Sequence, residues 1–404
     1  MTDIAIVGGG MVGATLALAL APLGRRIALI EAVPHDADGQ PSFDERTTAL
    51  SNGSRRVLET LGVWDSVAYA ATPIAKIHVS DQGRFGFARI DAAAQGLEAM
   101  GYVVPNRVLG AVLWAHLQAC PTVSTYCPAE LVAVRPGDAA VGLDLALADG
   151  ATAALEARLV IAADGIRSAV RAAFGVAAES RDYGQTAVIT TVLPQRFHDN
   201  VAYERFTEMG PLALLPLGDG RCTLVLTLET ALATEAMGWG DTRFLDEVQR
   251  RFGFRLGRFL QVGRRVAYPL SLTRSTRTSA PRCAIVGAAA QGLHPVAGMG
   301  FNLGLRDMAS LAELLADLPP DADCGDAQLL AAYDTWRAAD RRAIIGFTDG
   351  LVRVFSSPSG VVRRLRNLAL LAFDLLPPAK AALSALSTGA SGRIPKLSRG
   401  VALR

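Results

Sequence analysis

The sequence contains few residues of the kinds that support metal or disulfide chemistry. It has five cysteines and five histidines in 404 residues. No two cysteines have C-x-x-C spacing and the histidines are dispersed, so we expect reduced thiols in a cytoplasmic protein and no metal site. Nucleophile-elbow and P-loop patterns are also missing from the sequence. Metal-dependent hydrolysis and serine catalysis are therefore disfavoured.

Long apolar runs and a strong excess of one charge are missing as well. No apolar run approaches the ~20 residues that a membrane span needs, and a first strand that starts at residue 3 predicts no targeting peptide. The formal net charge is only +2, which argues against a nucleic-acid partner. The charge is uneven, however, because residues 337–404 hold twelve Lys and Arg against three Asp and Glu. This predicts a basic C-terminal face.

The beginning of the chain has the pattern strand, glycine loop, helix, strand. Residues 3–7 contain the apolar run Ile4 to Val7, typical of a buried parallel strand. Residues 14–23 repeat leucine at helical spacing, and residues 26–30 contain a second apolar run, Ile27 to Ile30. The loop between the first strand and the helix has the sequence Gly8-Gly9-Gly10-Met11-Val12-Gly13. This is the G-x-G-x-x-G spacing in the context that a dinucleotide requires.

Each glycine of this loop has a physical role. Gly8 allows the tight turn, Gly10 lets the backbone approach a pyrophosphate, and Gly13 lets the helix pack closely on the strand. The unpaired N–H groups at the helix start favour an anion. Glu31, after the second strand, is placed to accept hydrogen bonds from a ribose. An acid there disfavours a 2′-phosphate, so NAD or FAD fits better than NADP.

Two later segments have the same pattern of a buried strand followed by glycine. Residues 158–163 contain the apolar run Leu159 to Ala163 and lead into Asp164-Gly165, with Arg167 and Arg171 entering a helix. Alone, this dipeptide is a common turn. Residues 282–287 form another strand before a glycine-rich loop and a helix with leucines on one face. The amides of such a loop can stabilise negative charge on a reduced flavin.

Between these segments the pattern changes to short strands. Residues 74–102 and 183–272 predict a largely antiparallel sheet that forms one wall of a substrate pocket. Tyr203, Phe206 and Leu214 are candidate substrate contacts, with core packing as the alternative for each. The predicted fold class is α/β. It combines a Rossmann-like domain (residues 1–73, 103–182 and 273–345), the interleaved sheet domain and a C-terminal helical basic tail (residues 346–404).

In their order and spacing, the three nucleotide-facing segments resemble the flavoprotein aromatic hydroxylases of the para-hydroxybenzoate hydroxylase type. Within that group the chain is most similar to the ubiquinone-biosynthesis hydroxylases, in particular the UbiH branch. The resemblance to this branch rests on residues 204–207 (ERFT), 210–216 (GPLALLP), 289–291 (AAQ), 293–295 (LHP), 300–304 (GFNLG) and 348–351 (TDGL).

The resemblance implies FAD as the cofactor. It places Arg46 and Arg107 near the flavin or its ribityl-phosphate chain. It also places a loop against the isoalloxazine, with Pro295, Gly298, Gly300, Phe301, Asn302 and Leu303 as the contacts. Two positions depart from the family. Ala288 stands where an acid or amide usually bonds the ribityl chain, and Met299 stands where the branch usually has Gln.

The reaction implied by the resemblance is the insertion of one oxygen atom from O2 into a phenolic ring through a flavin C4a-hydroperoxide. In such a reaction, positioning and exclusion of water matter more than a side-chain nucleophile. His294, beside Pro295, is a candidate catalytic residue, with a structural role as the alternative. The chain has no second dinucleotide fingerprint, so NAD(P)H is expected to bind transiently.

The expected substrate is a polyprenyl phenol, which fits an amphipathic tail. Apolar residues at helical spacing (Val361, Leu365, Leu368, Leu371, Leu375) lie beside Arg363, Arg364 and Arg366. This pattern fits peripheral contact with a membrane at its inner face or with a biosynthetic complex; a helix packed on the core is the alternative. Three other functions stay open: a hydroxylase of a small soluble aromatic, a flavin-binding scaffold and an NAD-dependent dehydrogenase.

Overall fold

The computed structural model describes residues 1–37, 40, 44, 46–294, 298–355, 376, 380 and 392–403. Pro295 lies outside the described residues. So does the predicted amphipathic helix of the tail, from Val361 to Leu375. The domain boundaries predicted from the sequence stay a prediction, and the architecture is described here sheet by sheet.

The first sheet is built around β1 (Thr2–Val7), whose apolar residues are buried on both faces. Its parallel strands, in spatial order, are β19 (Cys283–Ile285), β11 (Thr152–Ala162), β1, β2 (Ile27–Ile30) and β8 (Val123–Tyr126). Three antiparallel strands extend it: β18 (Ser279–Ala280) beside β19, and β10 (Val141–Leu147) and β9 (Ala129–Arg135) beyond β11.

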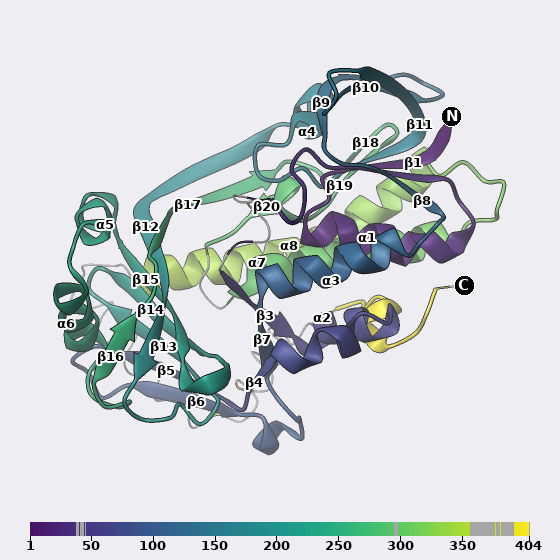
Figure 1. Ribbon diagram of the computed structural model, residues 1–404. Coiled ribbons are helices and arrows are strands. Elements are labelled where there is room, and N and C mark those ends of the chain that lie inside the picture. Colours follow the sequence, from purple (N-terminus) through teal and green to yellow (C-terminus); the bar gives the residue numbers. More distant parts are fainter. Residues whose placement is uncertain are drawn as a thin grey trace.

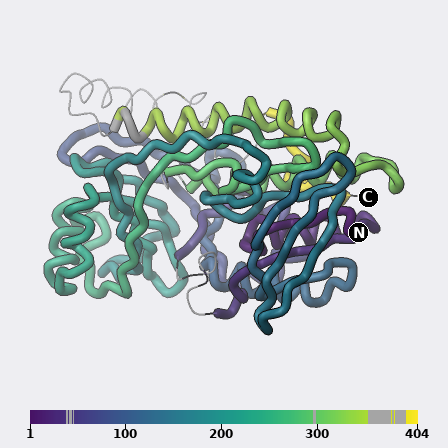
Figure 2. Tube along the Cα trace, turned by 90° about the horizontal axis from the view of Figure 1, so that it is seen from above, coloured from purple at the N-terminus to yellow at the C-terminus, as the bar shows by residue number. Residues whose placement is uncertain are grey.

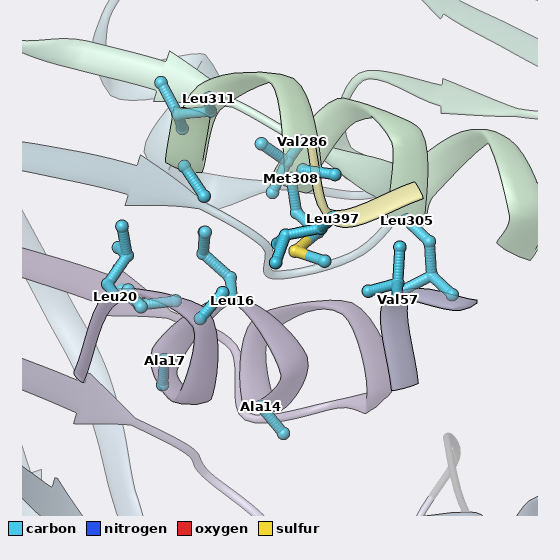
Figure 3. Close-up of a cluster of buried hydrophobic side chains, with 14 of the residues drawn as sticks. Ala14, Leu16, Ala17, Leu20, Val57, Val286, Leu305, Met308, Leu311 and Leu397 are labelled. Carbon is cyan, nitrogen blue, oxygen red and sulfur yellow. The ribbon is translucent and has the colours of Figure 1, made fainter. Parts of the chain in front are cut away.

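Helices cover one face of this sheet. The covering helices are α1 (Met11–Leu20), α3 (Asn106–Gln118) and α7 (Met299–Ala316) (Figure 1). Figure 3 shows Leu16 and Leu20 of α1 against Met308 and Leu311 of α7, with Leu397 from the C-terminal segment beside them. The other face packs against β9 and β10 and the short helix α4 (Ala169–Ala173).

The second large sheet is mainly antiparallel, as predicted. In spatial order it contains β20 (Gln291–Gly292), β17 (Val266–Ser275), β12 (Ala178–Pro194), β15 (Cys222–Glu229), β14 (Gly210–Pro216), β13 (Val201–Thr207), β5 (Lys76–Asp81) and β6 (Phe87–Asp91), while β16 (Phe259–Val262) pairs with β12. Only the pair of β13 and β5 is parallel. Helices α5 (Thr230–Met237) and α6 (Asp241–Phe252) pack on one face.

A small sheet joins the two large ones. It consists of β3 (Thr47–Ser51), β7 (Gly101–Pro105) and β4 (Thr72–Ile74), with α2 (Asn52–Thr60) following β3. The 29-residue helix α8 (Ala327–Phe355) contacts β18 of the first large sheet and β14 of the second. In Figure 2 this yellow-green helix runs along the length of the molecule. The prediction of an α/β fold with a helical C-terminal region is confirmed.

The described part of the C-terminal segment packs on the first large sheet's helices. Leu397 is buried, Lys396 pairs with Asp317 of the turn after α7 (2.6 Å), and Arg393 pairs with Glu313 of α7 (3.2 Å). Part of the basic charge counted in the sequence is therefore neutralised within the fold. Among the helices that the structure describes, none combines the length and apolarity needed to cross a bilayer.

A buried charge network locks α8 to α7. Arg337 of α8 and Asp307 of α7 are almost completely inaccessible to solvent and pair at 2.8 Å, and Asp340 bridges Arg337 and Arg306 at 2.6 Å each. Asp307 also accepts hydrogen bonds from the backbone N–H of Gly287 (3.3 Å) and the side chain of Gln291 (2.5 Å). The network therefore holds the segment after β19 in place.

Removing Asp307 should destabilise the protein strongly. The substitution Asp307→Ala leaves the buried guanidinium of Arg337 with less compensation, and breaking such a pair costs about 3–5 kcal/mol. The free energy of unfolding from a urea titration measures the loss. Arg250→Ala is the control, because the Arg250 side chain is 66% exposed in its pair with Glu247, and ion pairs of exposed side chains contribute little. Equal midpoints for the two variants would contradict the role given to the network.

Candidate functional site

Close backbone packing shapes the turn between β1 and α1. Gly8 has φ +103°, and a Cβ added there would lie 2.4 Å from the carbonyl oxygen of Ala163 at the end of β11. A Cβ on Gly13 would lie 1.9 Å from the carbonyl oxygen of Gly8. Neither position accepts a side chain without moving the backbone. The start of α1 is thereby held against the carboxyl ends of β1 and β11, as the glycine spacing predicts.

The start of α1 offers free donors beside an acid. Gly10 precedes the helix and has no side chain to cap it, so the first N–H groups, from Met11 onward, remain available to an anion. Glu31 lies next to the loop, where its Oε2 accepts from the N–H of Gly9 at 2.6 Å and its Oε1 from the N–H of Val33 at 2.9 Å. These bonds fix its carboxylate at the position predicted for a ribose contact.

Two aromatic rings complete this end of the site and were missed by sequence reasoning. The indole N–H of Trp114 in α3 donates to the carbonyl oxygen of Gly9 (3.1 Å). The imidazole of His35 stacks on the Trp114 ring with 5.3 Å between centroids. Both residues come from outside the glycine motif. A Trp on the apolar face of a helix looks like core in sequence, so no local signal identifies it.

The second predicted segment brings an unsatisfied carboxylate oxygen to the same edge. Asp164 comes two residues after the end of β11, with Ala163 between them. Its Oδ2 accepts a hydrogen bond from the N–H of Val170 (3.1 Å). Its Oδ1 is buried and has no hydrogen-bond partner among the described residues. Burial raises the pKa of Asp164. Gly165, with φ +83°, turns the chain away, which leaves a buried oxygen suited to a ligand hydroxyl.

The third segment meets the first around Val12. A Cβ on Gly287 or on Gly304 would lie 3.2 Å or 3.0 Å from the Val12 side chain. Arg171, which follows the Asp164 turn, donates to the carbonyl oxygen of Ala289 (2.6 Å). All three nucleotide-facing segments predicted from the sequence are thus in contact, although they lie far apart in the chain. Ala288 is exposed between Gly287 and Ala289.

Asn302 fixes the start of α7 through hydrogen bonds within the protein. Its side-chain oxygen accepts from the backbone N–H of Ser51 and the hydroxyl of Ser54, and its amide donates to the carbonyl oxygens of Ala49 and Gly298. The amide is fully used within the protein, so Asn302 positions α7 against β3. Gly298, at φ +60°, precedes the helix without a capping side chain, so the N–H groups of the first turn remain for a ligand.

The other residues predicted at this loop have mixed surroundings. Met299 and Leu303 are buried against Ile344 of α8. Phe301 packs, partly buried, on the core between the first sheet and its covering helices, and a Cβ on Gly300 would meet open space. Their contact with the cofactor, like that of Pro295, stays a prediction.

Arg46 lies where the first and second large sheets approach each other. Its guanidinium pairs with Asp44 (2.7 Å) and lies over the ring of Tyr268 of β17, 4.4 Å from the centroid. The Tyr268 hydroxyl donates to Asp44 (2.5 Å), and burial, followed by this bond, raises the pKa of Tyr268 to about 12. Arg107 is exposed at the start of α3 and makes no hydrogen bond or ion pair with another described residue. The cofactor contacts of both arginines stay predictions.

His294 is buried rather than presented to solvent. Its ring lies edge-on to Tyr183 of β12, 5.4 Å between centroids, and the Tyr183 hydroxyl donates to Asp349 of α8 (3.1 Å). Burial lowers the pKa of His294 to about 4, so the imidazole is neutral at pH 7. A catalytic role for His294 stays a prediction.

The three predicted substrate contacts lie on opposite faces of the second sheet. Tyr203 and Leu214 belong to the buried cluster between the sheet and α6, and Tyr203 packs edge-on to Phe252 of that helix. Phe206 lies on the other face, which approaches β3 through the hydroxyl contact of Thr223 with Thr47 (3.0 Å). Alternation along a strand separates these residues, and the structure therefore does not bring the three together.

The arrangement fits FAD. Four features supply what a dinucleotide and its ribityl chain require. They are a glycine cradle, two helix starts with free N–H groups, a ribose-directed acid, and a buried carboxylate oxygen with no partner among the described residues. These groups come from β1 and α1, the ends of β2 and β11, and α7, at one edge of the first sheet.

Comparison with solved structures identifies the class of fold. The chain is similar to the p-nitrophenol 4-monooxygenase PnpA from Pseudomonas putida DLL-E4, with a TM-score of 0.79 and 19% identity over 97% of this chain and 99% of that one. It is also similar to PqsL of P. aeruginosa, with a TM-score of 0.76 and 23% identity over 92% and 99% of the two chains. The fold is that of the para-hydroxybenzoate hydroxylase type of flavin monooxygenase.

The sequence comparisons then show the family. The family described as "FAD binding domain" matches residues 1–348. Ubiquinone hydroxylase UbiL of Rhodospirillum rubrum is 38% identical over all of this chain and 94% of its own length. The 3-demethoxyubiquinol 3-hydroxylase of Escherichia coli is 34% identical over 92% and 95% of the two chains, and human COQ6, a ubiquinone biosynthesis monooxygenase, is 30% identical over 96% and 92%.

The chain belongs to the FAD-binding family of flavoprotein monooxygenases that includes the ubiquinone-biosynthesis hydroxylases. It is thus an FAD-dependent monooxygenase, as the resemblance implied.

Gly8→Ala should weaken FAD binding more than it lowers the stability of the fold. Forcing a side chain into this backbone conformation costs ~1–3 kcal/mol, which corresponds to roughly 5- to 100-fold in affinity. Flavin absorbance of the purified variant, titrated with FAD, measures the change. Gly346→Ala is the matched control, because a Cβ there meets nothing within 4 Å. Unchanged FAD affinity in Gly8→Ala would remove the glycine cradle from the cofactor site.

Proposed function

We propose that this monooxygenase inserts one oxygen atom of O2 into the ring of a polyprenylated phenol during ubiquinone biosynthesis, with NAD(P)H as the reductant. The full-length similarity to UbiL, together with the mutual contact of the three nucleotide-facing segments at Gly8, Val12 and Ala289, carries this proposal.

The residues that would hold FAD come from the first sheet and α7. The turn from Gly8 to Gly13 and the start of α1 would bind the pyrophosphate, and Glu31 the adenosine ribose. The free oxygen of Asp164 would accept from a ribityl hydroxyl, and the first turn of α7 would face the flavin ring. When bound, FAD supplies the two-electron activation of O2 that hydroxylation needs.

The protein's own contribution is to orient the ring and exclude water. The face of the second sheet that carries Phe206 would cover the phenol, and the contact between Arg46 and Tyr268 would hold this sheet against the segment before β3. His294, neutral at pH 7, would contribute as a hydrogen-bonding or packing group rather than as a cation.

The C-terminal tail would give the enzyme access to an apolar substrate. We infer that the basic residues beyond α8 bring the enzyme to the inner face of a membrane or to a partner enzyme, where a polyprenyl chain is available. The support is the charge and apolar spacing of residues 361–375, which lie outside the described residues. The cytoplasmic location predicted from the thiols stays a prediction.

The direct test is the visible spectrum of the purified protein followed by turnover. We expect flavin absorbance, NAD(P)H oxidation stimulated by a short-chain prenyl methoxyphenol, and a product heavier by one oxygen atom. Turnover of small soluble phenols alone would favour the soluble-aromatic hydroxylase. Bound flavin that no phenol and no reductant turns over would favour a scaffold and contradict the proposal.

Restoring the family's acidic residue at position 288 should tighten FAD binding. Ala288 is exposed in the third segment, next to Gly287, which lies against Val12, and Ala288→Asp offers the ribityl chain an acceptor. One such hydrogen bond contributes ~1 kcal/mol, or roughly fivefold in affinity. Titration of apoprotein with FAD measures it, with Ala288→Ser as a smaller polar control. Weaker binding in Ala288→Asp would show that the acid does not face the cofactor.

A further inference from the structure

We propose that the carboxylate of Glu204 accepts the phenolic proton of the substrate during ring hydroxylation. This assignment rests on the proposed function. Neither the dinucleotide cradle nor the contacts described above involve Glu204, and it lies on the face of the second sheet that carries Phe206.

The register of the second sheet places Glu204 toward the cofactor-binding half. Directly opposite residues in a sheet share a face, as do alternate residues along a strand. The row that contains Glu204 runs from Val79 of β5 through Ala213 of β14, Val225 of β15 and Ile189 of β12 to Val266 of β17. All of these partners are apolar.

The two neighbouring rows show which way this face points. One row contains Ala202, which packs with Val103 of the small sheet, and Thr223, whose hydroxyl meets Thr47 of β3. The other row contains Phe206 and ends at Tyr268, beneath Arg46. Glu204 therefore lies on the face that approaches β3 and the Arg46 segment, opposite to the face covered by α6.

Glu204 has no polar partner of its own. It is half-buried, and it makes no hydrogen bond or ion pair with any described residue. Its side chain stands among Val79, Ala202, Phe206 and Ala213. Desolvation alone raises the pKa of Glu204 to about 7. A carboxyl group in these surroundings changes its protonation state near neutral pH, as a general base requires.

Among the charged groups near Glu204, one shares its face, and the others project to the opposite face or are paired elsewhere. Asp81 is the titratable group on the same face of β5, two residues beyond Val79. Asp349 of α8 is bonded to Tyr183, and Asp44 is paired with Arg46 and Tyr268. His78, Tyr203 and Arg205 project to the opposite face, which α6 covers. Lys76 pairs with Asp91 at the sheet edge.

The proposed step is a proton transfer coupled to carbon–oxygen bond formation. As one oxygen atom of O2 bonds to a ring carbon conjugated with the phenol, the O–H proton moves to a Glu204 oxygen. The other oxygen atom leaves as water, whose formation takes two electrons and one hydrogen from NAD(P)H and one proton from solvent. The new hydroxyl takes up a second solvent proton, and the attacked carbon releases its own proton to solvent as the ring becomes aromatic again. Glu204 then returns the phenolic proton to the phenolate. The carboxylate is thus regenerated, with no net proton gained by the protein.

The experiment compares the pH dependence of kcat/KM for hydroxylation in the wild-type holoenzyme, Glu204→Gln and Glu204→Asp. We expect the wild-type value to rise with pH through about 7, because the ionised carboxylate is the active form. Glu204→Gln should lose this rise and fall roughly 100-fold at pH 8. Glu204→Asp should retain the rise at a lower rate. Glu229→Gln, an exposed carboxyl at the end of β15, is the matched control and should behave as the wild type.

A substrate series separates proton transfer from a structural effect. If Glu204 takes the proton, more acidic phenols, such as ring-fluorinated ones, should reduce the deficit of Glu204→Gln, whereas a packing defect would affect all phenols equally. A wild-type profile that is flat between pH 6 and 8 would overturn the assignment even if the Gln variant fails to fold. So would wild-type rates in Glu204→Gln. Failure of the wild type to hydroxylate any phenol would instead overturn the proposed function.

Discussion

Backbone contact at the start of α1 determines where the rest of the site can lie. The Cβ that Gly13 lacks would overlap the carbonyl oxygen of Gly8, and Gly287 and Gly304 leave room only for the side chain of Val12. Three segments separated by more than a hundred residues each are thus held at van der Waals distance. Because protein interiors are close-packed, a methyl group at any of these glycines would displace a strand end or a helix start. The cofactor's groups can be bound by backbone N–H donors only while this contact is kept.

The charge network behind this contact has a different role. Asp307 holds the N–H of Gly287 and the amide of Gln291, and Arg337 and Arg341 of α8 bind Asp307 and Gln291 in turn. Because α8 also reaches the second sheet, a shift of this helix would move both the third nucleotide-facing segment and the substrate wall. The network therefore connects the third nucleotide-facing segment to the second sheet through one helix.

The backbone of the predicted cofactor cradle follows from the sequence more directly than the substrate wall does. Gly8, Gly13, Glu31 and Asp164 occupy the turn, close-contact and strand-end positions that their motifs demand, because each motif is local and its backbone demands are visible in residue type; their contacts with FAD stay predictions. Tyr203 and Leu214 were predicted to line the pocket with Phe206, yet they pack under α6. Period-two alternation shows that Tyr203 and Phe206 face opposite ways, but it does not say which face meets the cofactor domain. That decision depends on where α6 docks.

By itself, the sequence determined the βαβ unit and the α/β class, since these follow from short-range patterns of glycine, acid and apolar residues, and its resemblance to a known family implied FAD. Only the tertiary structure decided which distant groups share a site. Trp114 and His35 join the loop at Gly9, and Asn302 turns inward to clamp β3. Glu204 comes to stand in a row of apolar residues with its carboxylate unpaired among the described residues. The physical reason is that desolvation and hydrogen-bond satisfaction are properties of neighbours brought together by strand pairing and helix packing, and residue spacing along the chain does not encode them directly.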